Sequence, residues 1–316
     1  MIITVTLNPA LDKTARCDVL RPNALNRLRD VSIDAGGKGV NVSAMIRVLG
    51  GNSIATGFAG GGAGEELIAG LAGKGLEHDF VRIASVTRTN LKVINDAGNV
   101  TELNEPGPEI TGEEFAALEK KLAAFGTKGN TFILSGSLPR GIKSDAYKKL
   151  CGTLRQNGAE VFLDADGEAL ELALDAGPDA VPCFLKPNRY ELLKLFGIQD
   201  GSEITEAVLS PLCVKLLDKG VSLVCLSLGH EGALFVSREG IRRSPALPVT
   251  VKSTVGAGDS MVGALVYGFE NGLPQEHCFA LAMAASAGAC TTEGTNPPSR
   301  FLVDELLQQV CVQKIS

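Results

Sequence analysis

The sequence predicts an α/β fold, with a doubly wound, mainly parallel sheet flanked by helices and a small β-sheet outside the core. Short runs of β-branched residues alternate with helix-spaced apolar patterns from the first residue to the last. Several runs end in glycine or polar residues, as strands do when they deliver loops to a ligand site. No stretch rich in proline, glycine or serine is long enough to separate domains. We therefore expect one domain over residues 1–316, with insertions at about residues 12–34 and 88–105 forming the small sheet.

The composition is that of a globular protein without a general affinity for nucleic acid. Hydrophobic residues make up 45% of the 316 residues, and 30 Lys and Arg against 36 Asp and Glu give a net charge of −6. The eight cysteines are scattered without a C-x-x-C pair, which is typical of reduced residues in a cytoplasmic protein. Neither a signal peptide nor an apolar run that spans a bilayer is found, so we expect a cytoplasmic location.

The first predicted strand covers residues 2–7 and ends at Asn8-Pro9, so that Asp12 lies on the loop after it. In an open α/β sheet, ligands bind beyond the carboxyl ends of the strands. This position favours a ligand-binding role for Asp12. The alternative is a loop carboxylate in solvent.

A glycine turn at residues 35–42 precedes a predicted helix that stops at Gly50-Gly51. A helix start that contains Lys38 suits an anion, although neither Gly-Lys pair is followed by Ser or Thr as in a Walker loop. The alternative is an ordinary helix start with a solvated lysine.

Five glycines between residues 57 and 64 predict a loop, which either passes close to a ligand or is merely flexible. Residues 90–95 and 100–103 predict a hairpin that forms the small sheet together with residues 18–34. Arg88 precedes the hairpin, as a ligand-binding or simply an exposed arginine.

A second buried strand at residues 131–134 leads into Ser135–Gly141, where Ser137 and Arg140 supply polar groups at the crevice. Arginine is a bidentate donor suited to phosphate. Another strand end follows at residues 161–164.

Asn188 and Glu191 lie three residues apart where a strand turns into a helix. An amide and a carboxylate so placed can hold Mg²⁺ through water near phosphates. The same spacing is also that of a capping box, in which the two residues only cap the start of the helix.

The longest motif is residues 253–260, Ser-Thr-Val-Gly-Ala-Gly-Asp-Ser, followed by a helix-spaced apolar run. Gly256 and Gly258 predict a tight turn whose amides face outward at a helix start, where the helix dipole favours an anion. Asp259 lies just inside that positive end and is a candidate base. The alternative is that Asp259 only caps the helix.

Six of these motifs, in this order, resemble those of the ribokinase/PfkB family of carbohydrate kinases over essentially the whole chain. The resemblance implies that Asp259 is the catalytic base and that Gly256, Ala257 and Gly258 form the anion hole. Substrate contacts are implied for Asp12, Gly37, Lys38, Gly39, Asn41, Arg88, Ser137 and Arg140. Nucleotide contacts are implied for Lys186, Asn188, Ser227, Gly229, Gly232, Thr254, Gly256 and Gly258, and water-mediated Mg²⁺ contacts for Asn188 and Glu191. One departure from the family is Asp166, which stands where relatives usually have a small hydroxyl residue.

The octet most resembles the branch of that family that phosphorylates fructose 1-phosphate. Lys38 in Gly-Gly-Lys-Gly is shared with tagatose-6-phosphate kinases, which tend to have Pro-Val-Gly-Ser in the octet, whereas enzymes acting on fructose 6-phosphate can carry glycine at position 38. The resemblance thus implies ATP-dependent phosphorylation at C6 with Mg²⁺. It also implies a lid formed by the small sheet, and a homodimer through that lid. A non-catalytic sugar-phosphate sensor and a dinucleotide-dependent enzyme are the alternatives, and the missing G-x-G-x-x-G fingerprint disfavours the second.

Overall fold

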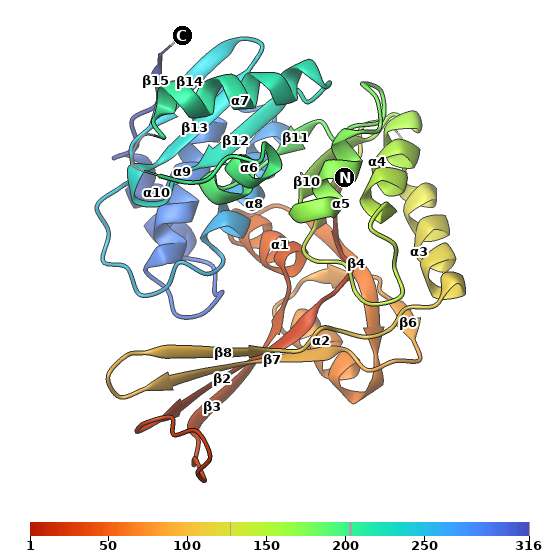
Figure 1. Ribbon diagram of the computed structural model, residues 1–316, viewed down its shortest axis with the longest axis vertical. Helices are drawn as coiled ribbons and strands as arrows, with labels where there is room; N and C mark the ends of the chain where they lie inside the picture. Colours follow the sequence, from red (N-terminus) through yellow and green to blue (C-terminus); the bar gives the residue numbers. More distant parts are fainter. Residues whose placement is uncertain (127, 202–203, 316) are drawn as a thin grey trace.

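The protein forms a large twisted sheet with helices on both faces and a small sheet at one end (Figure 1). The computed structural model describes residues 1–126, 128–201 and 204–315. Within these residues, the large sheet has the strand order β15-β14-β13-β12-β11-β10-β9-β1-β4-β5, and β6 pairs with β4. Its strands are β1 (Ile2–Thr6), β4 (Ser53–Gly60), β5 (Glu77–His78), β6 (Val81–Ile83), β9 (Thr131–Ser135), β10 (Glu160–Asp164), β11 (Phe184–Leu185), β12 (Leu223–Ser227), β13 (Ala233–Ser237), β14 (Gly240–Ser244) and β15 (Gln313–Lys314).

The strand order reverses at β1, which pairs in parallel with β4 on one side and β9 on the other. Pairing stays parallel from β9 to β12 and becomes antiparallel from β12 to β15. Thr6 and Asp164 both align with Ser135, so the carboxyl ends of three neighbouring strands share one edge. A crevice at such a reversal is where open α/β sheets bind ligands.

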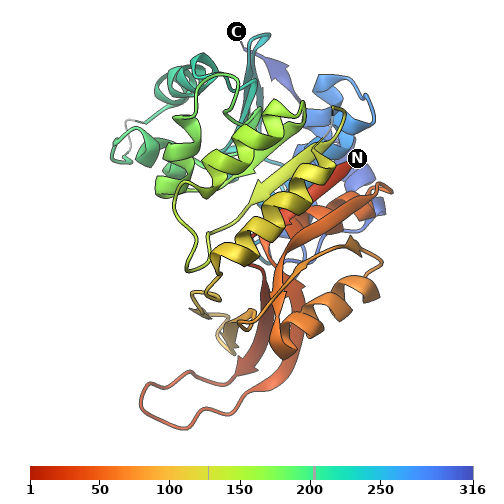
Figure 2. The ribbon, with the colours of Figure 1, turned by 90° about the vertical axis from the view of Figure 1, so that its right-hand side faces the viewer.

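Alternation of side chains along the strands builds two hydrophobic cores. Ile3, Val5 and Leu134 pack on one face under α3, α4, α5 and α7, while Ile2 and Ile133 pack on the other under α1, α8 and α9. Figures 1 and 2 show these two helical layers. The helices are α1 (Lys38–Val48), α2 (Gly61–Gly73), α3 (Gly112–Phe125), α4 (Ala146–Gln156), α5 (Gly167–Leu174), α6 (Arg189–Leu195), α7 (Glu206–Asp218), α8 (Ala257–Glu270), α9 (Gln275–Cys290) and α10 (Arg300–Leu307), with the short 3₁₀ turn η1 (Gly229–Glu231).

The small sheet has the order β3-β2-β7-β8 and projects from the large sheet at the end where β1 and β4 lie (Figure 2). Its strands are β2 (Ala10–Cys17), β3 (Arg29–Gly36), β7 (Arg88–Asn95) and β8 (Val100–Asn104). The sheet consists of two antiparallel pairs joined by the parallel pairing of β2 with β7. The predicted fold class is confirmed, including the small separate sheet.

Several local predictions were wrong. Asp12 lies within strand β2 and not on a loop. The glycine-rich residues 57–64 form the end of β4 and the first turn of α2, because a Cβ at Gly57 would lie 1.9 Å from the Thr6 carbonyl oxygen, so glycine permits the close β1–β4 pairing. The small sheet takes its first strand from residues 10–17, while residues 19–28 connect it to β3.

The cysteines were expected to be reduced. In the structure all eight are free, and six of them are buried. Across the described ranges, every helix is too short or too polar to serve as a membrane span.

Candidate active site

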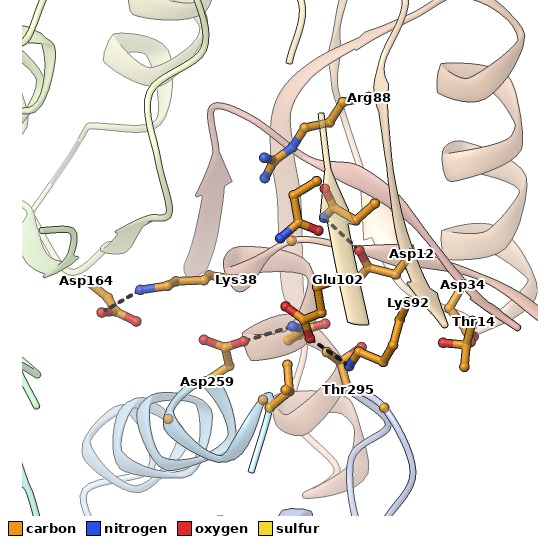
Figure 3. Close-up of a pocket in the computed structure, with 18 of the residues that line it drawn as sticks. Asp12, Thr14, Asp34, Lys38, Arg88, Lys92, Glu102, Asp164, Asp259 and Thr295 are labelled. Atoms are coloured by element: carbon orange, nitrogen blue, oxygen red, sulfur yellow. Dashed lines mark hydrogen bonds and ion pairs between the residues drawn. The ribbon is translucent and has the colours of Figure 1, made fainter. Parts of the chain in front are cut away.

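A polar cavity of about 370 Å³ lies between the small sheet and the carboxyl edge of the large sheet (Figure 3). Side chains from both ends of the chain meet there, because β2, α1, β7, β10 and α8 all reach it. It is lined by Asp12, Lys13, Thr14, Asp34, Gly37, Lys38, Asn41, Arg88, Asn90, Lys92, Glu102, Asn104, Asp164, Lys186, Asn188, Glu191, Val255, Gly256, Gly258, Asp259, Gly294 and Thr295. We call it the polar cavity.

A second cavity of about 800 Å³ adjoins the first, since Asn188 and Gly258 line both. One part of its wall is apolar and carries Leu247, Val249 and Met283. The rest is made by loops after β11 and β12 and by the start of α8. We call it the apolar cavity, and its volume and partly apolar wall suit a small organic ligand.

Helix α8 begins at the junction of the two cavities. Its N-cap, Gly256, has φ 81°, a conformation that favours glycine, and a Cβ there would lie 3.3 Å from the Thr295 Cα. Gly258 also lies close to a neighbour, since a Cβ there would lie 3.0 Å from the Nζ of the flexible Lys186 side chain. The amides at the start of this 14-residue helix have no partner within the helix, so the turn is suited to an anion.

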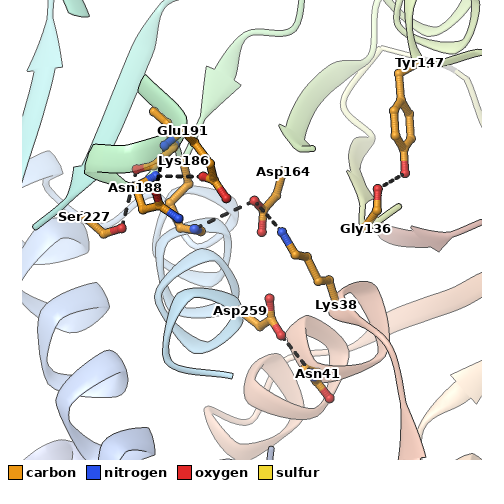
Figure 4. Close-up of polar contacts among 11 residues, drawn as sticks. Lys38, Asn41, Gly136, Tyr147, Asp164, Lys186, Asn188, Glu191, Ser227 and Asp259 are labelled. Carbon is orange, nitrogen blue, oxygen red and sulfur yellow. Dashed lines mark hydrogen bonds and ion pairs between the residues drawn. The ribbon is translucent and has the colours of Figure 1, made fainter. Parts of the chain in front are cut away.

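Asp259 is the third residue of α8 and makes no capping hydrogen bond, so the interpretation of Asp259 as a simple helix cap is wrong. Its buried carboxylate instead accepts a hydrogen bond of 2.8 Å from the Asn41 side-chain amide in α1 (Figure 4). Burial and the negative charge of Asp164 raise the pKa of Asp259 to about 6, although Asn41, Lys38 and Lys186 act in the opposite direction. Asp259 is therefore a carboxylate that accepts a proton more readily than an exposed one.

Asp164 is held in the opposite state. Burial disfavours its charge, but Lys186 and Lys38 outweigh that effect and lower the pKa of Asp164 below its ordinary value. The Lys38 Nζ donates to the Asp164 Oδ1 at 3.1 Å, and the Lys186 Nζ lies 3.8 Å from the same oxygen. In turn, Asp164 and Asp259 outweigh burial and raise the pKa of Lys38. This part of the cavity therefore holds two charged lysines around one permanent anion.

The small sheet contributes Asp12, whose Oδ1 accepts a hydrogen bond of 2.9 Å from the Asn90 side chain. Burial raises the pKa of Asp12, while Asn90, Lys92 and Arg88 oppose that rise. A Cβ at Gly36 would lie 2.1 Å from the Asp12 Oδ2, so glycine leaves room for this carboxylate.

Arg88 lies at the start of β7, where the small sheet leaves the core. Its guanidinium donates to the carbonyl oxygens of Asn8 at 3.0 Å and Glu105 at 3.2 Å, while its buried Nε has no hydrogen-bond partner. Burial lowers the pKa of Arg88, a cost that an anionic ligand would offset.

Asn188 and Glu191 form a capping box at the start of α6, with reciprocal hydrogen bonds of 2.8 Å. Both residues also line the polar cavity, and the capping bond occupies Oε2 of Glu191. The side-chain oxygens of Asn188 and Glu191 are suited to binding Mg²⁺ through water molecules. Among the described residues, no group of three or more His, Cys, Asp or Glu side chains could hold a metal ion without such help.

Most of the remaining predicted site residues line one of the two cavities. Ser227, Gly229, Gly232, Thr254 and Ala257 line the apolar cavity, and Gly37 and Lys186 line the polar one.

Ser137, Arg140 and Gly39 do not line either cavity. Ser137 accepts a hydrogen bond of 3.2 Å from the Asn8 side chain, and exposed Arg140 donates to the Gly107 carbonyl oxygen at 3.1 Å. Gly39 is needed for packing, since a Cβ there would lie 2.5 Å from the Thr6 Oγ1.

Other lining residues were not predicted from the sequence, notably Asn90, Lys92, Glu102 and Thr295. Asn90 and Lys92 follow Arg88 at intervals of two residues, so strand alternation from Arg88 places them on one face. That pattern was the available signal for the missed lysine.

A proton-accepting carboxylate beside an anion-binding helix start, between a polar and an apolar cavity, defines an enzyme that transfers an anionic group to a hydroxyl. Comparison with known proteins gives the family. The model of the pfkB family carbohydrate kinases matches residues 5–301, and the chain belongs to that family.

Relatives of similar length support this assignment. The 1-phosphofructokinase of Xanthomonas campestris is 39% identical, covering 90% of this chain and 89% of its own. That of Borreliella burgdorferi is 33% identical, covering 100% and 99%. The crystal structure of phosphofructokinase-2 from Escherichia coli in complex with potassium superimposes with a TM-score of 0.91 at 31% identity, covering 98% of each chain.

Proposed function

We propose that this protein is an ATP-dependent kinase that phosphorylates fructose 1-phosphate at C6 to give fructose 1,6-bisphosphate. The observation that carries the proposal is Asp259, whose pKa is raised to about 6 at the first turn of α8, where the two cavities meet. Relatives named 1-phosphofructokinase match over nearly the whole chain, which supports the choice of substrate.

In the proposed reaction, the C6 hydroxyl oxygen attacks the γ-phosphorus of ATP while the bond from that phosphorus to the bridging β,γ-oxygen breaks. The hydroxyl proton passes to the Asp259 carboxylate, and ADP leaves with the electron pair of the broken bond. A base with a pKa of about 6 is ionised at neutral pH and still basic enough to accept this proton. The amides of Gly256, Ala257 and Gly258 stabilise the charge on the transferring phosphoryl group.

The acceptor occupies the polar cavity. Asp12 accepts hydrogen bonds from sugar hydroxyls, and Arg88 binds the phosphate already on the sugar, as its buried unpartnered Nε supports. Lys38 and Arg140 complete that phosphate site, with Gly37, Gly39, Asn41 and Ser137 around it. Arg140 reaches the phosphate only if its bond to Gly107 is exchanged for the ligand.

The nucleotide occupies the apolar cavity, with its base against Leu247, Val249 and Met283. Ser227, Gly229, Gly232 and Thr254 lie along the ribose and phosphates, which point toward Lys186 and the start of α8. Asn188 and Glu191 hold Mg²⁺ through water, where the ion neutralises charge on the phosphate oxygens.

We also propose that the chain is one catalytic domain, that the small sheet is its lid, and that it functions as a cytoplasmic homodimer formed through the lid. Small isolated sheets are marginal in water and leave open edges, which a symmetric pairing would cover. Hereafter the small sheet is called the lid.

The test of the substrate is kcat/KM for fructose 1-phosphate, tagatose 6-phosphate and fructose 6-phosphate at fixed Mg-ATP. We expect fructose 1-phosphate to lead. If tagatose 6-phosphate leads by tenfold or more, about 1.4 kcal/mol in transition-state preference, the substrate is wrong while the kinase class stands. If none of the three is phosphorylated, the proposed function fails.

A further inference from the structure

The face of the lid that lines the polar cavity carries polar side chains in two rows across its strands. Strand pairing places Asp34, Asp12, Asn90 and Asn104 in the first row. The same pairing places Ser32, Thr14, Lys92 and Glu102 in the second row, two residues further along each strand. The first row contains the sugar-binding candidate Asp12, whereas no role has been given to the second row.

The second row lies midway along the strands of the lid, on the side of the first row that is away from Arg88. Arg16 follows Thr14 by two residues on β2, and its Nη2 lies 3.8 Å from the Glu293 Oε1. Glu293 belongs to the loop whose Gly294 and Thr295 line the polar cavity, and Thr295 packs against Gly256. The lid therefore approaches the phosphoryl-binding turn at the Arg16 side of the second row, as Figure 3 shows for Lys92, Glu102 and Thr295.

Arg88 is the first residue of β7, whereas Lys92 lies in the middle of that strand. It is bonded to the Asn8 carbonyl oxygen beside the core, four residues before Lys92. At roughly 3.3 Å per residue, the two Cα atoms are about 13 Å apart. The two side chains therefore enter the polar cavity at different points along the lid.

The charge of Lys92 is available for exchange. Its Nζ lies 3.4 Å from the Glu102 Oε1, and the side chains are 19% and 45% exposed. Such a partly exposed cross-strand pair stabilises the fold only weakly. Lys38 and Lys186, by contrast, are both paired with the buried Asp164, so an anionic ligand would share them with that carboxylate. A phosphoryl group carries more charge than Glu102 and would displace it.

We propose that Lys92 binds the phosphoryl group during its transfer, exchanging the ion pair with Glu102 for that group when both substrates are bound. The inference rests on the proposed kinase function and adds a catalytic residue supplied by the lid. In the step, the ammonium donates a hydrogen bond to one equatorial oxygen and neither gains nor loses a proton. Glu102 keeps the ammonium directed into the cavity until the phosphoryl group arrives.

The test compares the Lys92→Met variant with wild type on two acceptors, fructose 1-phosphate and fructose, which has no phosphate for Arg88 to bind. We expect kcat/KM to fall by a similar factor of about 10 to 100 with both acceptors, with the KM for fructose 1-phosphate changed less than about threefold. Arg88→Met should instead raise the KM for fructose 1-phosphate by a much larger factor than it lowers kcat. Lys92→Arg should recover part of the lost kcat.

Lys121→Met is the matched control, because Lys121 is also ion-paired, to Asp79, and its side chain is 23% exposed outside both cavities. It should leave both activities unchanged. If Lys92→Met raises only the KM for fructose 1-phosphate, Lys92 binds the phosphate of the acceptor and the inference is wrong. Unchanged kcat values in that variant would overturn it as well.

A second measurement does not depend on turnover. Calorimetry with Mg-ADP and fluoroaluminate, a mimic of the phosphoryl group in transfer, should show at least tenfold weaker binding of the mimic to Lys92→Met, with ADP alone unaffected. Equal binding of the mimic by both proteins would contradict the inference. If wild type phosphorylates no sugar but Lys92→Met still loses the mimic, the proposed substrate fails and the role of Lys92 stands.

Discussion

At the scale of single residues, two aspartates in one cavity are driven to opposite protonation behaviour. Asp164 faces the ammonium groups of Lys38 and Lys186, so its pKa falls despite burial. Asp259 accepts a hydrogen bond from the neutral side-chain amide of Asn41. Burial, together with the negative charge of Asp164, raises the pKa of Asp259 to about 6. Pairs of carboxylates whose pKa values are pushed apart mark acid–base sites.

Replacing Asp259 with asparagine should lower kcat by roughly 10² to 10⁴ and change KM little, because a general base acts mainly in the transition state. Steady-state kinetics with saturating Mg-ATP would measure this change. Asp166→Asn is the control, since Asp166 is exposed and lines neither cavity. Near wild-type turnover by Asp259→Asn would exclude Asp259 as the base.

The raised pKa of Asp259 predicts two pH effects. The reaction needs the deprotonated form, so kcat/KM should rise with pH through about 6 and then level off. In folding, the native pKa lies above the ordinary value of 3.8, so Asp259 costs no stability below about pH 4 and destabilises increasingly as the pH rises to about 6.

Asp259→Asn should therefore melt at a higher temperature than wild type at pH 7.5 and at a similar temperature at pH 4. The difference at pH 7.5 is on the order of 3 kcal/mol, because folding raises the pKa of Asp259 from 3.8 to about 6. Thermal unfolding at both pH values would measure it. An asparagine variant that is less stable at pH 7.5 would show that burial of the charge is not costly.

Residues beside glycine turns and strand ends were predictable as candidates. Asp12, Lys38, Asn41 and Asp259 come from three separate motifs, and all four line the polar cavity. Lys92 was missed because its position depends on the pairing of β2 with β7, two strands far apart in sequence. Their roles, like that of Arg140, stay predictions.

At the scale of elements, the capping box of α6 combines two uses of one residue pair. Asn188 and Glu191 cap the start of the helix and also line the polar cavity. The two alternatives that the sequence left open, capping and metal binding, are compatible, and the hydrogen bonds establish the first. The second stays a prediction.

Glu191→Gln separates these uses, because the amide oxygen can still accept the hydrogen bond from Asn188 while the negative charge is lost. We expect an unchanged melting temperature and a several-fold higher Mg²⁺ concentration for half-maximal activity. Glu114→Gln in α3 is the matched control, since Thr111 and Glu114 form a similar capping box away from both cavities. An unchanged Mg²⁺ requirement in Glu191→Gln would remove Glu191 from the metal site.

The amino-acid composition of each segment decided whether its secondary structure could be predicted from the sequence. The strands β1, β9 and β10 are mainly apolar and were recognised within about one residue, whereas the glycines of β4 and α2 suggested a loop. Gly57 is in β4 because the backbone of β1 comes too close for a side chain. Such a constraint comes from the neighbouring strand and leaves no local signal.

At the scale of the whole molecule, the lid exposes apolar side chains on the face opposite the polar cavity. Ile33 and Leu103 are 45% and 56% exposed and alternate with residues of the two polar rows. The doubly wound architecture was predictable because strand and helix patterns alternate throughout. What covers the outer face of the lid cannot be deduced from one chain.

We predict that two lids pair, so the protein should sediment as a dimer at micromolar concentration. Ile33→Asp should shift it to monomer by placing a charge in the apolar contact. Phe301→Asp is the control, because Phe301 is 77% exposed and lies outside the lid. A wild-type monomer with full activity would refute dimerisation through the lid.

The hydrogen bond from Asn41 to Asp259 joins residues 218 positions apart, and β1, the first strand of the chain, lies inside the large sheet between β9 and β4. High contact order of this kind slows folding, because the entropic cost of closing a long loop arises before the stabilising contacts form. During synthesis, Asn41 leaves the ribosome long before α8. Asp259 therefore acquires its raised pKa only when almost the entire chain has been made.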